Sequence, residues 1–379
     1  MAVGETTQKG SWTPEESLDE LAQLAATAGA NVVGRLIQHM PMPSKTHYLG
    51  KGKIVELVKL AGSSGASVVI FDDELTPIQQ RNLEDSLKIK VIDRVALILD
   101  IFARSARTSE GKVQVELAQH EYLLPRLAGQ WSHLERLGGG IGTRGPGESQ
   151  LETDKRLIHK RIQRLKEKLE EVRMHRELHR EQRRRSSLPV ISLVGYTNAG
   201  KSTLLNTLAN AGVLAADKLF STLDPTTRRL VLPDKSYVLL SDTVGFIRKL
   251  PPAVINAFRA TLEELEEANI ILHVVDISSP AAAAQCQVVE DILTELRLSG
   301  KPRITALNKI DLLVKFSKDW GEDEALNYIT QMIGGPGKNM VMISAKNGWG
   351  LKKLLETINR VVNAIKRPAP ENPPENDAL

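Results

Sequence analysis

The sequence predicts an α/β protein in three parts: an N-terminal domain on a parallel sheet, a long antiparallel helical hairpin and a P-loop domain. Three observations support this prediction. Strand-like and helix-like segments alternate over residues 30–100, which is typical of a parallel sheet. Two long helical patterns follow over residues 109–185. A phosphate-binding motif at 195–202 then stands between an apolar strand and a helix.

Length and composition favour a multidomain protein, and the cysteine content favours a reducing compartment. A chain of 379 residues favours two to three domains, and 41% hydrophobic residues are enough to form their cores. The single cysteine, Cys286, excludes an intramolecular disulfide and favours a reducing compartment. The sequence begins without a signal-peptide pattern and has no apolar run of about 20 residues, so we expect no membrane span. We also expect a monomer.

The N-terminal domain is predicted to cover residues 1–105. Strands are expected at 31–37, 67–71 and 90–93, and helices at 51–61 and 95–102. A further helix is expected to begin at Thr76, the N-cap, with Pro77 in its first position. Asp72, Asp73 and Glu74 follow the middle strand, where ligands often bind in such sheets. Structural capping is nevertheless the favoured role for these three carboxylates.

The helical hairpin is predicted to cover residues 106–188. Val113, Leu117 and Leu124 share one helical face, and Leu151, Ile158, Leu165 and Val172 recur every seven residues on a second helix. Two antiparallel helices packed along these stripes explain the pattern. The second helix is otherwise rich in arginine and lysine, which favours an RNA or phosphate-binding surface over a merely solvated face.

A glycine-rich loop, 138–147, joins the two predicted helices. It is longer than an ordinary helix connection, and its glycines allow the backbone to approach another molecule closely. Arg144 lies in it, with Arg126, Trp131, His133 and Arg136 nearby. At the tip of a basic hairpin, this loop is predicted to insert into RNA rather than to act as a plain connector.

The P-loop domain is predicted to cover residues 189–366. Its phosphate-binding motif is Gly195-Tyr196-Thr197-Asn198-Ala199-Gly200-Lys201-Ser202, between the apolar strand 190–194 and a helix. Backbone N–H groups and the positive helix N-terminus can therefore surround a polyphosphate. We expect Lys201 to bridge the β- and γ-phosphates, and the Ser202 hydroxyl to be a direct ligand of Mg²⁺.

The next two motifs lie where the γ-phosphate and the metal are expected. Asp242-Thr243-Val244-Gly245 follows a strand-like run, so Asp242 can hold Mg²⁺ through water and the Gly245 N–H can contact the γ-phosphate. Residues 220–228 are at the right distance for a first switch segment, in which one threonine completes the magnesium shell. Spacing alone does not choose among Thr222, Thr226 and Thr227.

Two later motifs predict guanine as the base. Asn308-Lys309-Ile310-Asp311 follows an apolar strand, and the Asp311 carboxylate can accept hydrogen bonds from two guanine N–H groups that adenine lacks. Lys309 can lie along the base, and Asn308 can brace the phosphate loop. The backbone of Ser344-Ala345-Lys346 can reach the guanine oxygen. GTP and GDP are therefore the expected nucleotides.

Phe246 follows Gly245, where many GTPases have a glutamine that orients the attacking water. A phenyl ring cannot hydrogen-bond water. We therefore expect slow intrinsic hydrolysis, with the water positioned by the backbone or by a partner. The alternative is that Phe246 packs locally and another group orients the water.

Several of these motifs together resemble the HflX family of ribosome-associated GTPases. The match is carried by the run from Gly138 to Asp154, by 71–75 and by 242–247, and it extends over roughly residues 20–366. The resemblance implies that a Ras-like GTPase domain follows the N-terminal α/β domain and the hairpin along the chain. It also implies binding to the large ribosomal subunit and its rRNA, splitting of stalled or idle ribosomes under stress, and a location in the cytoplasm.

The resemblance also implies roles for particular residues. In the family pattern Phe220-Ser221-Thr222-Leu223-Asp224, Thr222 falls at the magnesium-binding threonine, so the implied metal ligands are Ser202 and Thr222. The implied catalytic groups are Lys201, Thr222 and Gly245. Phe246 also fits the family pattern. Residues 367–379 form a proline-rich tail that is expected to be disordered.

Two other functions remain open from the sequence. The first is a nucleotide-gated protein-binding module, in which the hairpin is an arm for a protein rather than for RNA. The second is a ribosome-assembly factor, which would share the same nucleotide chemistry and the same partner. Salt dependence separates the first alternative from RNA binding, because phosphate contacts weaken steeply as salt rises.

Overall fold

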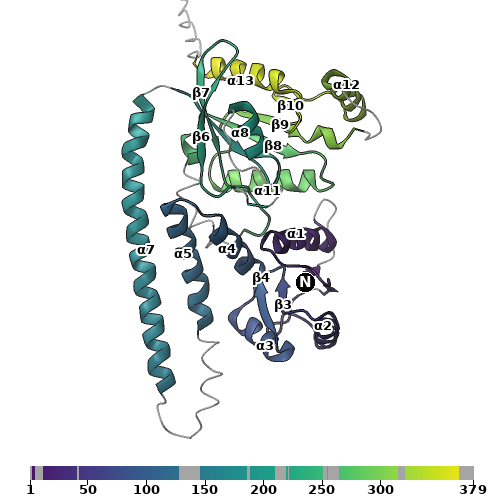
Figure 1. Cartoon of the computed structure of the whole chain (residues 1–379), viewed down its shortest axis with the longest axis vertical. Coiled ribbons are helices and arrows are strands. Elements are labelled where there is room, and N and C mark those ends of the chain that lie inside the picture. Colours follow the sequence, from purple (N-terminus) through teal and green to yellow (C-terminus); the bar gives the residue numbers. More distant parts are fainter. Residues whose placement is uncertain are drawn as a thin grey trace, which may run out of the picture.

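The computed structural model describes residues 2–4, 12–40, 42–127, 146–185, 188–209, 219–220, 222–250, 254, 264–314 and 321–366. Over these residues the predicted α/β class is confirmed (Figure 1). The P-loop domain lies at one end of the molecule and the N-terminal domain at the other. The helical hairpin runs along the side of both, so that its long second helix leads up into the P-loop domain.

The N-terminal domain has two short parallel strand pairs, β1–β2 and β3–β4, and four helices around them. Capping boxes start two of the helices: Thr13 with Glu16, and Thr76 with Gln79. The expected cap at Thr76 is therefore confirmed. The elements are β1 (Ala2–Gly4), α1 (Pro14–Thr27), β2 (Ile37–His39), α2 (Lys51–Ser64), β3 (Val68–Phe71), α3 (Pro77–Leu87), β4 (Lys90–Asp93) and α4 (Arg94–Ser105).

One predicted strand of this domain is wrong. Residues 31–36 have no regular structure, and β2 begins only at Ile37. Val32 and Val33 are 46% and 58% exposed, although their apolar, β-branched character suggested a strand. The reason is that no described strand pairs with this segment, because β3 pairs only with β4. Apolar β-branched residues without a partner strand do not form a sheet.

The hairpin consists of α5 (Ser109–Leu123), the short 3₁₀ helix η1 (Leu124–Arg126) and α7 (Pro146–Arg185). The predicted apolar stripes meet in a common cluster of Val113, Leu117, Leu124, Ile158, Ile162, Leu165 and Leu169. Of the seven-residue repeat on the second helix, Ile158 and Leu165 belong to this cluster, Val172 does not, and the Leu151 side chain lies outside the described residues. Of the expected glycine-rich loop, 138–147, residues 138–145 lie outside the described residues, and Pro146 and Gly147 are instead the first residues of α7. Although α7 is 40 residues long, neither it nor any other described helix is apolar over the length that a bilayer span needs.

Arg126 joins the hairpin to the N-terminal domain instead of facing an RNA partner. Its side chain is 8% exposed, and its Nη2 donates to the Leu75 carbonyl at 2.7 Å and to Asp93 at 3.2 Å. Tyr122 donates to the other Asp93 oxygen at 2.9 Å. The expectation that Arg126 lies with the RNA-contacting residues of the loop is therefore wrong. This arginine fixes the end of α5 to the end of β4.

The P-loop domain is built on a six-stranded sheet in the order β10-β9-β8-β5-β7-β6. All neighbours are parallel except β6 and β7. The central strand β5 therefore delivers the phosphate loop between two parallel neighbours. The elements are β5 (Val190–Val194), α8 (Lys201–Ala209), β6 (Thr226–Val231), β7 (Tyr237–Asp242), β8 (Ile270–Asp276), α11 (Ala282–Glu295), β9 (Arg303–Asn308), η2 (Ile310–Leu312), α12 (Glu322–Ile333), β10 (Met340–Met342) and α13 (Leu351–Lys366).

Candidate nucleotide-binding site

The phosphate loop joins the end of β5 to the start of α8 through a backbone path that requires glycine at two points. A Cβ on Gly195 would overlap the carbonyl oxygen of Val274 in β8. Gly200 has a φ of +96°, and a Cβ there would overlap the side-chain amide of Asn308. The loop is therefore packed tightly against the sheet on its inner side, which leaves the N-terminus of α8 to face a ligand.

Lys201 is held inside this loop. Its side chain is 5% exposed, and Nζ donates to the carbonyl oxygens of Gly195 at 3.2 Å and Tyr196 at 2.9 Å. Burial lowers the pKa of Lys201 to about 8, against the opposing effect of the Asp242 carboxylate. The ammonium group is therefore fixed and poorly solvated, and an anionic ligand in the loop would compensate its charge.

Three oxygen-bearing side chains converge beside Lys201. Ser202 Oγ lies 2.6 Å from Thr222 Oγ1 and donates to Asp242 Oδ2 at 2.6 Å. All three residues are buried. The two other candidate threonines lie elsewhere: Thr226 and Thr227 begin β6, and Thr227 Oγ1 donates to Ser241 Oγ at 3.1 Å. Of the three threonines left open by spacing, only Thr222 lies beside Ser202.

This group fits a magnesium ion. Burial raises the pKa of Asp242 against the opposing effect of Lys201, and Asp242 Oδ1 is a buried oxygen without a hydrogen-bond partner. A cation with its waters would satisfy that oxygen and favour the charged carboxylate. Within the described part of the chain, no three His, Cys, Asp or Glu side chains form a metal cluster. One carboxylate with two hydroxyls matches Mg²⁺, which commonly takes its remaining ligands from phosphates and water.

Gly245 lies against the phosphate loop. A Cβ at this position would come 2.8 Å from Thr197 Cα and 3.0 Å from Lys201 Nζ, so no side chain fits. The next residue, Phe246, pairs with the loop through two backbone hydrogen bonds: its N–H donates to Gly195 O at 3.1 Å and its carbonyl accepts from Thr197 N at 2.7 Å. The Phe246 ring is buried among Val194, Leu265 and Ile271. It is therefore a packing residue that faces away from solvent.

The first switch segment connects the phosphate loop to the other two parts of the molecule. The Phe220 N–H donates to Thr197 Oγ1 at 3.0 Å, and its ring meets Phe102 of α4 edge-on with centroids 4.6 Å apart. Leu223 is buried in the same apolar cluster. The Asp224 carboxylate accepts from backbone N–H groups at the start of α5, away from the phosphate loop. Ser221 lies outside the described residues.

The predicted base-recognition motifs meet at the ends of β9 and β10. Asn308 Nδ2 donates to the Ala199 carbonyl at 2.8 Å, and its Oδ1 accepts from the Ala345 N–H at 2.9 Å. This one amide therefore ties the phosphate loop to the 344–346 loop. Ser344 Oγ donates to Asp311 Oδ1 at 2.7 Å, which orients the carboxylate expected to recognise guanine.

The remaining predicted residues surround these groups. Lys309 Nζ forms an ion pair with Asp276 at 2.8 Å, a partner that the sequence did not indicate. Ile310 is fully buried, and Lys346 is exposed. Thr243 and Val244 are buried beside Gly245, and Thr243 Oγ1 donates to the Leu193 carbonyl at 2.6 Å.

Tyr196 differs from its neighbours in the phosphate loop, because its side chain points out of the loop and into the N-terminal domain. Its hydroxyl donates to Glu20 of α1 and accepts from the Arg248 N–H at 2.9 Å. Its ring stacks on Trp12 with centroids 6.1 Å apart. Burial raises the pKa of Tyr196, and the neighbouring Glu20 raises it further. Sequence reasoning missed this contact, since no local pattern pairs residues so far apart.

Family models match the three parts of the chain in order. Residues 15–103 match a model described as GTP-binding GTPase N-terminal, and residues 105–183 match the GTP-binding GTPase middle region. Residues 190–309 match a model described as 50S ribosome-binding GTPase.

Relatives named GTPase HflX cover most of the chain. GTPase HflX of Caldanaerobacter subterraneus subsp. tengcongensis is 51% identical over 346 residues, which are 91% of this chain and 77% of that protein. GTPase HflX of Escherichia coli is 43% identical over 365 residues, or 96% and 83% of the two chains. The crystal structure of a complex of SsGBP with GDP is similar with a TM-score of 0.50 and 26% identity, and covers 97% of this chain and 99% of that one.

Proposed function

This chain belongs to the HflX family of GTPases, and we propose that it is a GTP-driven switch that binds the large ribosomal subunit. It hydrolyses GTP to GDP and phosphate. We infer further that its GTP-bound form separates stalled or idle ribosomes under stress, as a monomer in the cytoplasm. The observation that carries the ribosomal part of the proposal is a basic face on α7 that has no acidic partner among the described residues.

The nucleotide binds with its phosphates at the N-terminus of α8. Backbone N–H groups of 195–202 surround the β-phosphate, and Lys201 bridges the β- and γ-phosphates. Ser202 and Thr222 would hold Mg²⁺ directly, and Asp242 would hold it through water. When bound, the metal neutralises charge on the phosphate oxygens. Recognition of guanine falls to Asp311, already oriented by Ser344.

Hydrolysis depends on positioning and electrostatics rather than on a covalent step. The Gly245 backbone N–H contacts the γ-phosphate from its place beside Lys201. Phe246 is 2% exposed and buried in the core, so its ring does not reach an attacking water. Turnover in the isolated protein is therefore slow, and the ribosome accelerates it by fixing the switch segments or by supplying a polar group.

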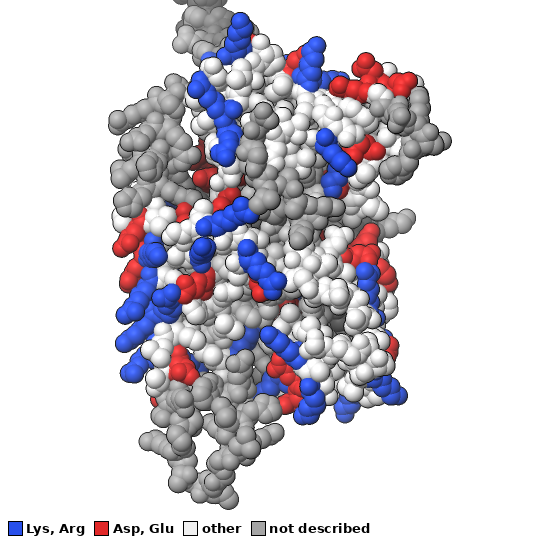
Figure 2. Space-filling view, in the orientation of Figure 1, with Lys and Arg blue, Asp and Glu red and all other residues white. Residues whose placement is uncertain are grey.

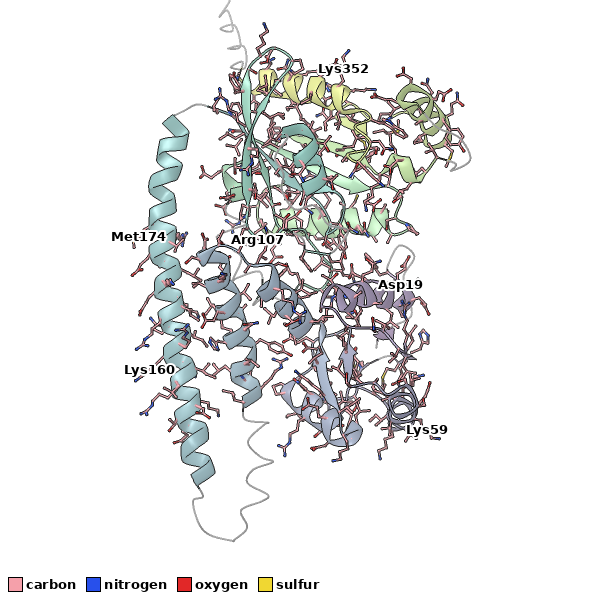
Figure 3. All side chains as sticks on the ribbon, in the orientation of Figure 1. Asp19, Lys59, Arg107, Lys160, Met174 and Lys352 are labelled. Atoms are coloured by element: carbon pink, nitrogen blue, oxygen red, sulfur yellow. The ribbon has the colours of Figure 1, made fainter. Side chains whose placement is uncertain are left out.

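The basic face of α7 comprises Arg156, Lys160, Arg164 and Lys168, spaced four residues apart along one side of the helix. All four are exposed, and no acidic side chain among the described residues pairs with them. By contrast, Arg161 and Lys166 are paired with Glu116 and Glu121 of α5. Lys160 points away from α5 in Figure 3, and blue side chains gather along this edge in Figure 2.

A row of cations without acidic partners in the described part of the chain suits a nucleic-acid backbone better than an apolar protein surface. Successive turns of the helix present one charge about every 6 Å. Phosphate contacts release counterions, so each gives binding a steep dependence on salt. The proposed partner of this face is therefore ribosomal RNA.

The test is co-sedimentation with purified large subunits in the presence of a non-hydrolysable GTP analogue or GDP. The quadruple variant Arg156→Gln, Lys160→Gln, Arg164→Gln and Lys168→Gln is compared with the native protein across a salt series. We expect analogue-dependent binding by the native protein. The variant should bind more weakly, and its salt slope should fall by about one for each phosphate that the native side chains neutralise.

A charge-matched control removes four exposed lysines from the P-loop domain: Lys338→Gln, Lys352→Gln, Lys353→Gln and Lys366→Gln. This control should bind subunits like the native protein. Equal losses of subunit binding in both quadruple variants would mean that binding depends only on net charge and not on the basic face of α7. If subunit binding by the native protein does not depend on salt concentration, the partner of this face is an apolar protein surface instead.

A further inference from the structure

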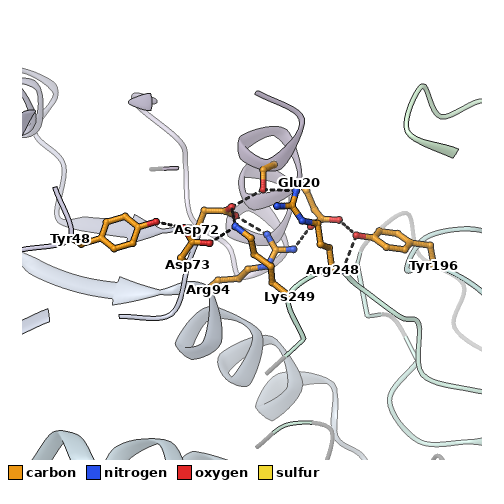
Figure 4. A network of polar contacts seen from close by, with 9 residues as sticks. Glu20, Tyr48, Asp72, Asp73, Arg94, Tyr196, Arg248 and Lys249 are labelled. Carbon is orange, nitrogen blue, oxygen red and sulfur yellow. Dashed lines mark hydrogen bonds and ion pairs between the residues drawn. The ribbon is translucent and has the colours of Figure 1, made fainter. Parts of the chain in front are cut away.

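A cluster of polar side chains joins the P-loop domain to the N-terminal domain (Figure 4). We call it the interdomain cluster, and we call residues 242–250 the second switch segment. From the P-loop domain the cluster takes Tyr196 of the phosphate loop and two residues of the second switch segment. Its members are Ser17, Glu20, Tyr48, Asp72, Asp73, Arg94, Tyr196, Arg248 and Lys249.

Asp72 is the centre of the cluster. Its side chain is fully buried and accepts hydrogen bonds from Ser17 at 2.6 Å, Arg94 at 2.8 Å and Lys249 at 2.7 Å. Burial alone would raise the pKa of Asp72, but Lys249 and Arg94 together lower it. Lys249 also bonds to Asp73. Carboxylates expected to serve as local caps therefore bind a cation from another domain.

Lys249 lies four residues beyond Gly245, and both ends of the intervening segment are fixed. At one end, the Phe246 backbone pairs with Gly195 and Thr197 of the phosphate loop. At the other end, Lys249 has a φ of +54° and reaches across to Asp72. The second switch segment is therefore held between the phosphate loop and the N-terminal domain.

This arrangement brings both switch segments to the side of the phosphate loop where a γ-phosphate would lie. Gly245 lies against Lys201 and Thr197, and Thr222 lies beside Ser202, so both switch segments are gathered around the phosphate loop. In GTPases such segments are ordered by the γ-phosphate and its metal, and they are released after hydrolysis. The contact of Lys249 with Asp72 and Asp73 thus belongs to the gathered arrangement.

We propose that Lys249 is a positioning residue for GTP hydrolysis: its clamp by Asp72 and Asp73 of the N-terminal domain holds Gly245 at the γ-phosphate site and favours GTP over GDP. The proposal rests on the nucleotide site proposed above. A contact shifts a conformational equilibrium only by its difference between the two states. A clamp formed with the triphosphate and released with the diphosphate therefore adds to the preference for GTP. A clamp present in both states would not.

The test measures the affinities of the full-length protein for GDP and for a non-hydrolysable GTP analogue. In Lys249→Met, the ratio of the GDP dissociation constant to the analogue dissociation constant should fall about tenfold, because hydrogen bonds to charged groups contribute this much. Single-turnover hydrolysis should slow, and Lys249→Arg should recover part of both losses.

A lysine far from the cluster supplies the matched control. Lys352 on α13 is exposed, and Lys352→Met should leave the affinity ratio unchanged. The partner side is tested with Asp73→Asn, whose carboxylate is partly exposed and so tolerates the change better than Asp72. If the clamp acts as proposed, Lys249→Met combined with Asp73→Asn should lower the ratio no further than Lys249→Met alone.

The outcomes separate the clamp from the site on which it rests. An unchanged ratio in Lys249→Met, even with a lower unfolding midpoint, would make the cluster a purely structural link and overturn the proposal. Retention of native nucleotide affinity in Lys201→Ala would overturn the nucleotide site itself. Loss of GDP and analogue binding in equal measure in Lys249→Met would also contradict selective positioning.

Discussion

At the scale of single residues, Lys201 makes nucleotide binding sensitive to pH. Burial lowers its pKa to about 8 in the free protein, and phosphates beside Nζ favour the charged form. Binding is therefore strongest below pH 8, where the ammonium is already formed, and weakens as pH rises through 8. Between pH 7 and 8.5 the protonated fraction falls about fourfold, so the affinity for GDP should fall by about the same factor.

Calorimetric titration with GDP over this range, in two buffers of different ionisation enthalpy, measures both the affinity and the proton uptake. Uptake of protons on binding should grow from pH 7 to 8.5. His273 provides no competing signal, because burial lowers its pKa to about 4 and it is neutral throughout. A flat affinity profile without proton uptake would show that Lys201 is fully charged in the free protein.

Residues whose partners are local were predictable from the sequence, and those whose partners are distant were not. The phosphate loop places Lys201 and Ser202 by its own turn and helix, so its spacing predicted their positions. Asp72 and Asp73 were expected to cap locally, yet Lys249, more than 170 residues further along, binds both. A carboxylate at the end of a strand looks the same in sequence whichever partner the fold brings to it.

At the scale of elements, the first hairpin helix begins on a residue of the first switch segment. The Asp224 carboxylate accepts from the N–H groups of Arg107 and Thr108, each at 2.9 Å, and from the Thr108 hydroxyl. Thr108 Oγ1 in turn accepts from Gly111 N at 2.9 Å. A carboxylate at a helix N-terminus satisfies free N–H groups and interacts favourably with the helix dipole.

Asp224→Ala should therefore loosen the start of α5. We expect faster hydrogen exchange in peptides covering Arg107 and Thr108, and a loss of about 1 kcal/mol in unfolding free energy. Asp234→Ala is the matched control, because Asp234 accepts from the Ser236 N–H in an exposed turn of the P-loop domain. Unchanged exchange at Arg107 and Thr108 in Asp224→Ala would show that Thr108 caps α5 without help.

Element boundaries followed the sequence where a cap or a repeating stripe fixed them. Thr76 and Pro77 start α3 as expected, and the seven-residue repeat on α7 places Ile158 and Leu165 against α5. The strand expected at 31–37 failed because pairing, which no single segment encodes, decides whether an apolar run becomes a strand. The buried role of Arg126 was hidden for a similar reason, since its partners are Asp93 at the end of β4 and Leu75, two residues before α3.

At the scale of the whole molecule, the three parts share one apolar core. Ile98 and Phe102 of α4, Val115 of α5, and Phe220 and Leu223 of the first switch segment belong to the same buried cluster. Both switch segments are thus attached outside their own domain: the first to the hairpin through Asp224, and the second to the N-terminal domain through Lys249. Release of the switch segments after hydrolysis should therefore loosen the whole P-loop domain from its two neighbours.

This coupling predicts a distance that depends on the nucleotide. Cys286→Ala removes the only cysteine, so labels can be placed at Lys160→Cys on α7 and Lys352→Cys on α13, which lie on different parts of the molecule in Figure 3. With the GTP analogue and Mg²⁺, double electron–electron resonance between two spin labels should give one narrow distance distribution. With GDP the distribution should broaden, because both attachments are weakened.

The variant carrying Asp224→Ala and Lys249→Met should give the broad distribution with either nucleotide, provided that it still binds the analogue. A second label pair within one part, Lys338→Cys and Lys352→Cys, should keep a narrow distance in every state and serves as the control. Identical narrow distributions for Lys160 and Lys352 with both nucleotides would mean that the shared core alone holds the parts together. The ribosome would then distinguish the GTP form from the GDP form by contacting the switch segments themselves, without movement of the hairpin.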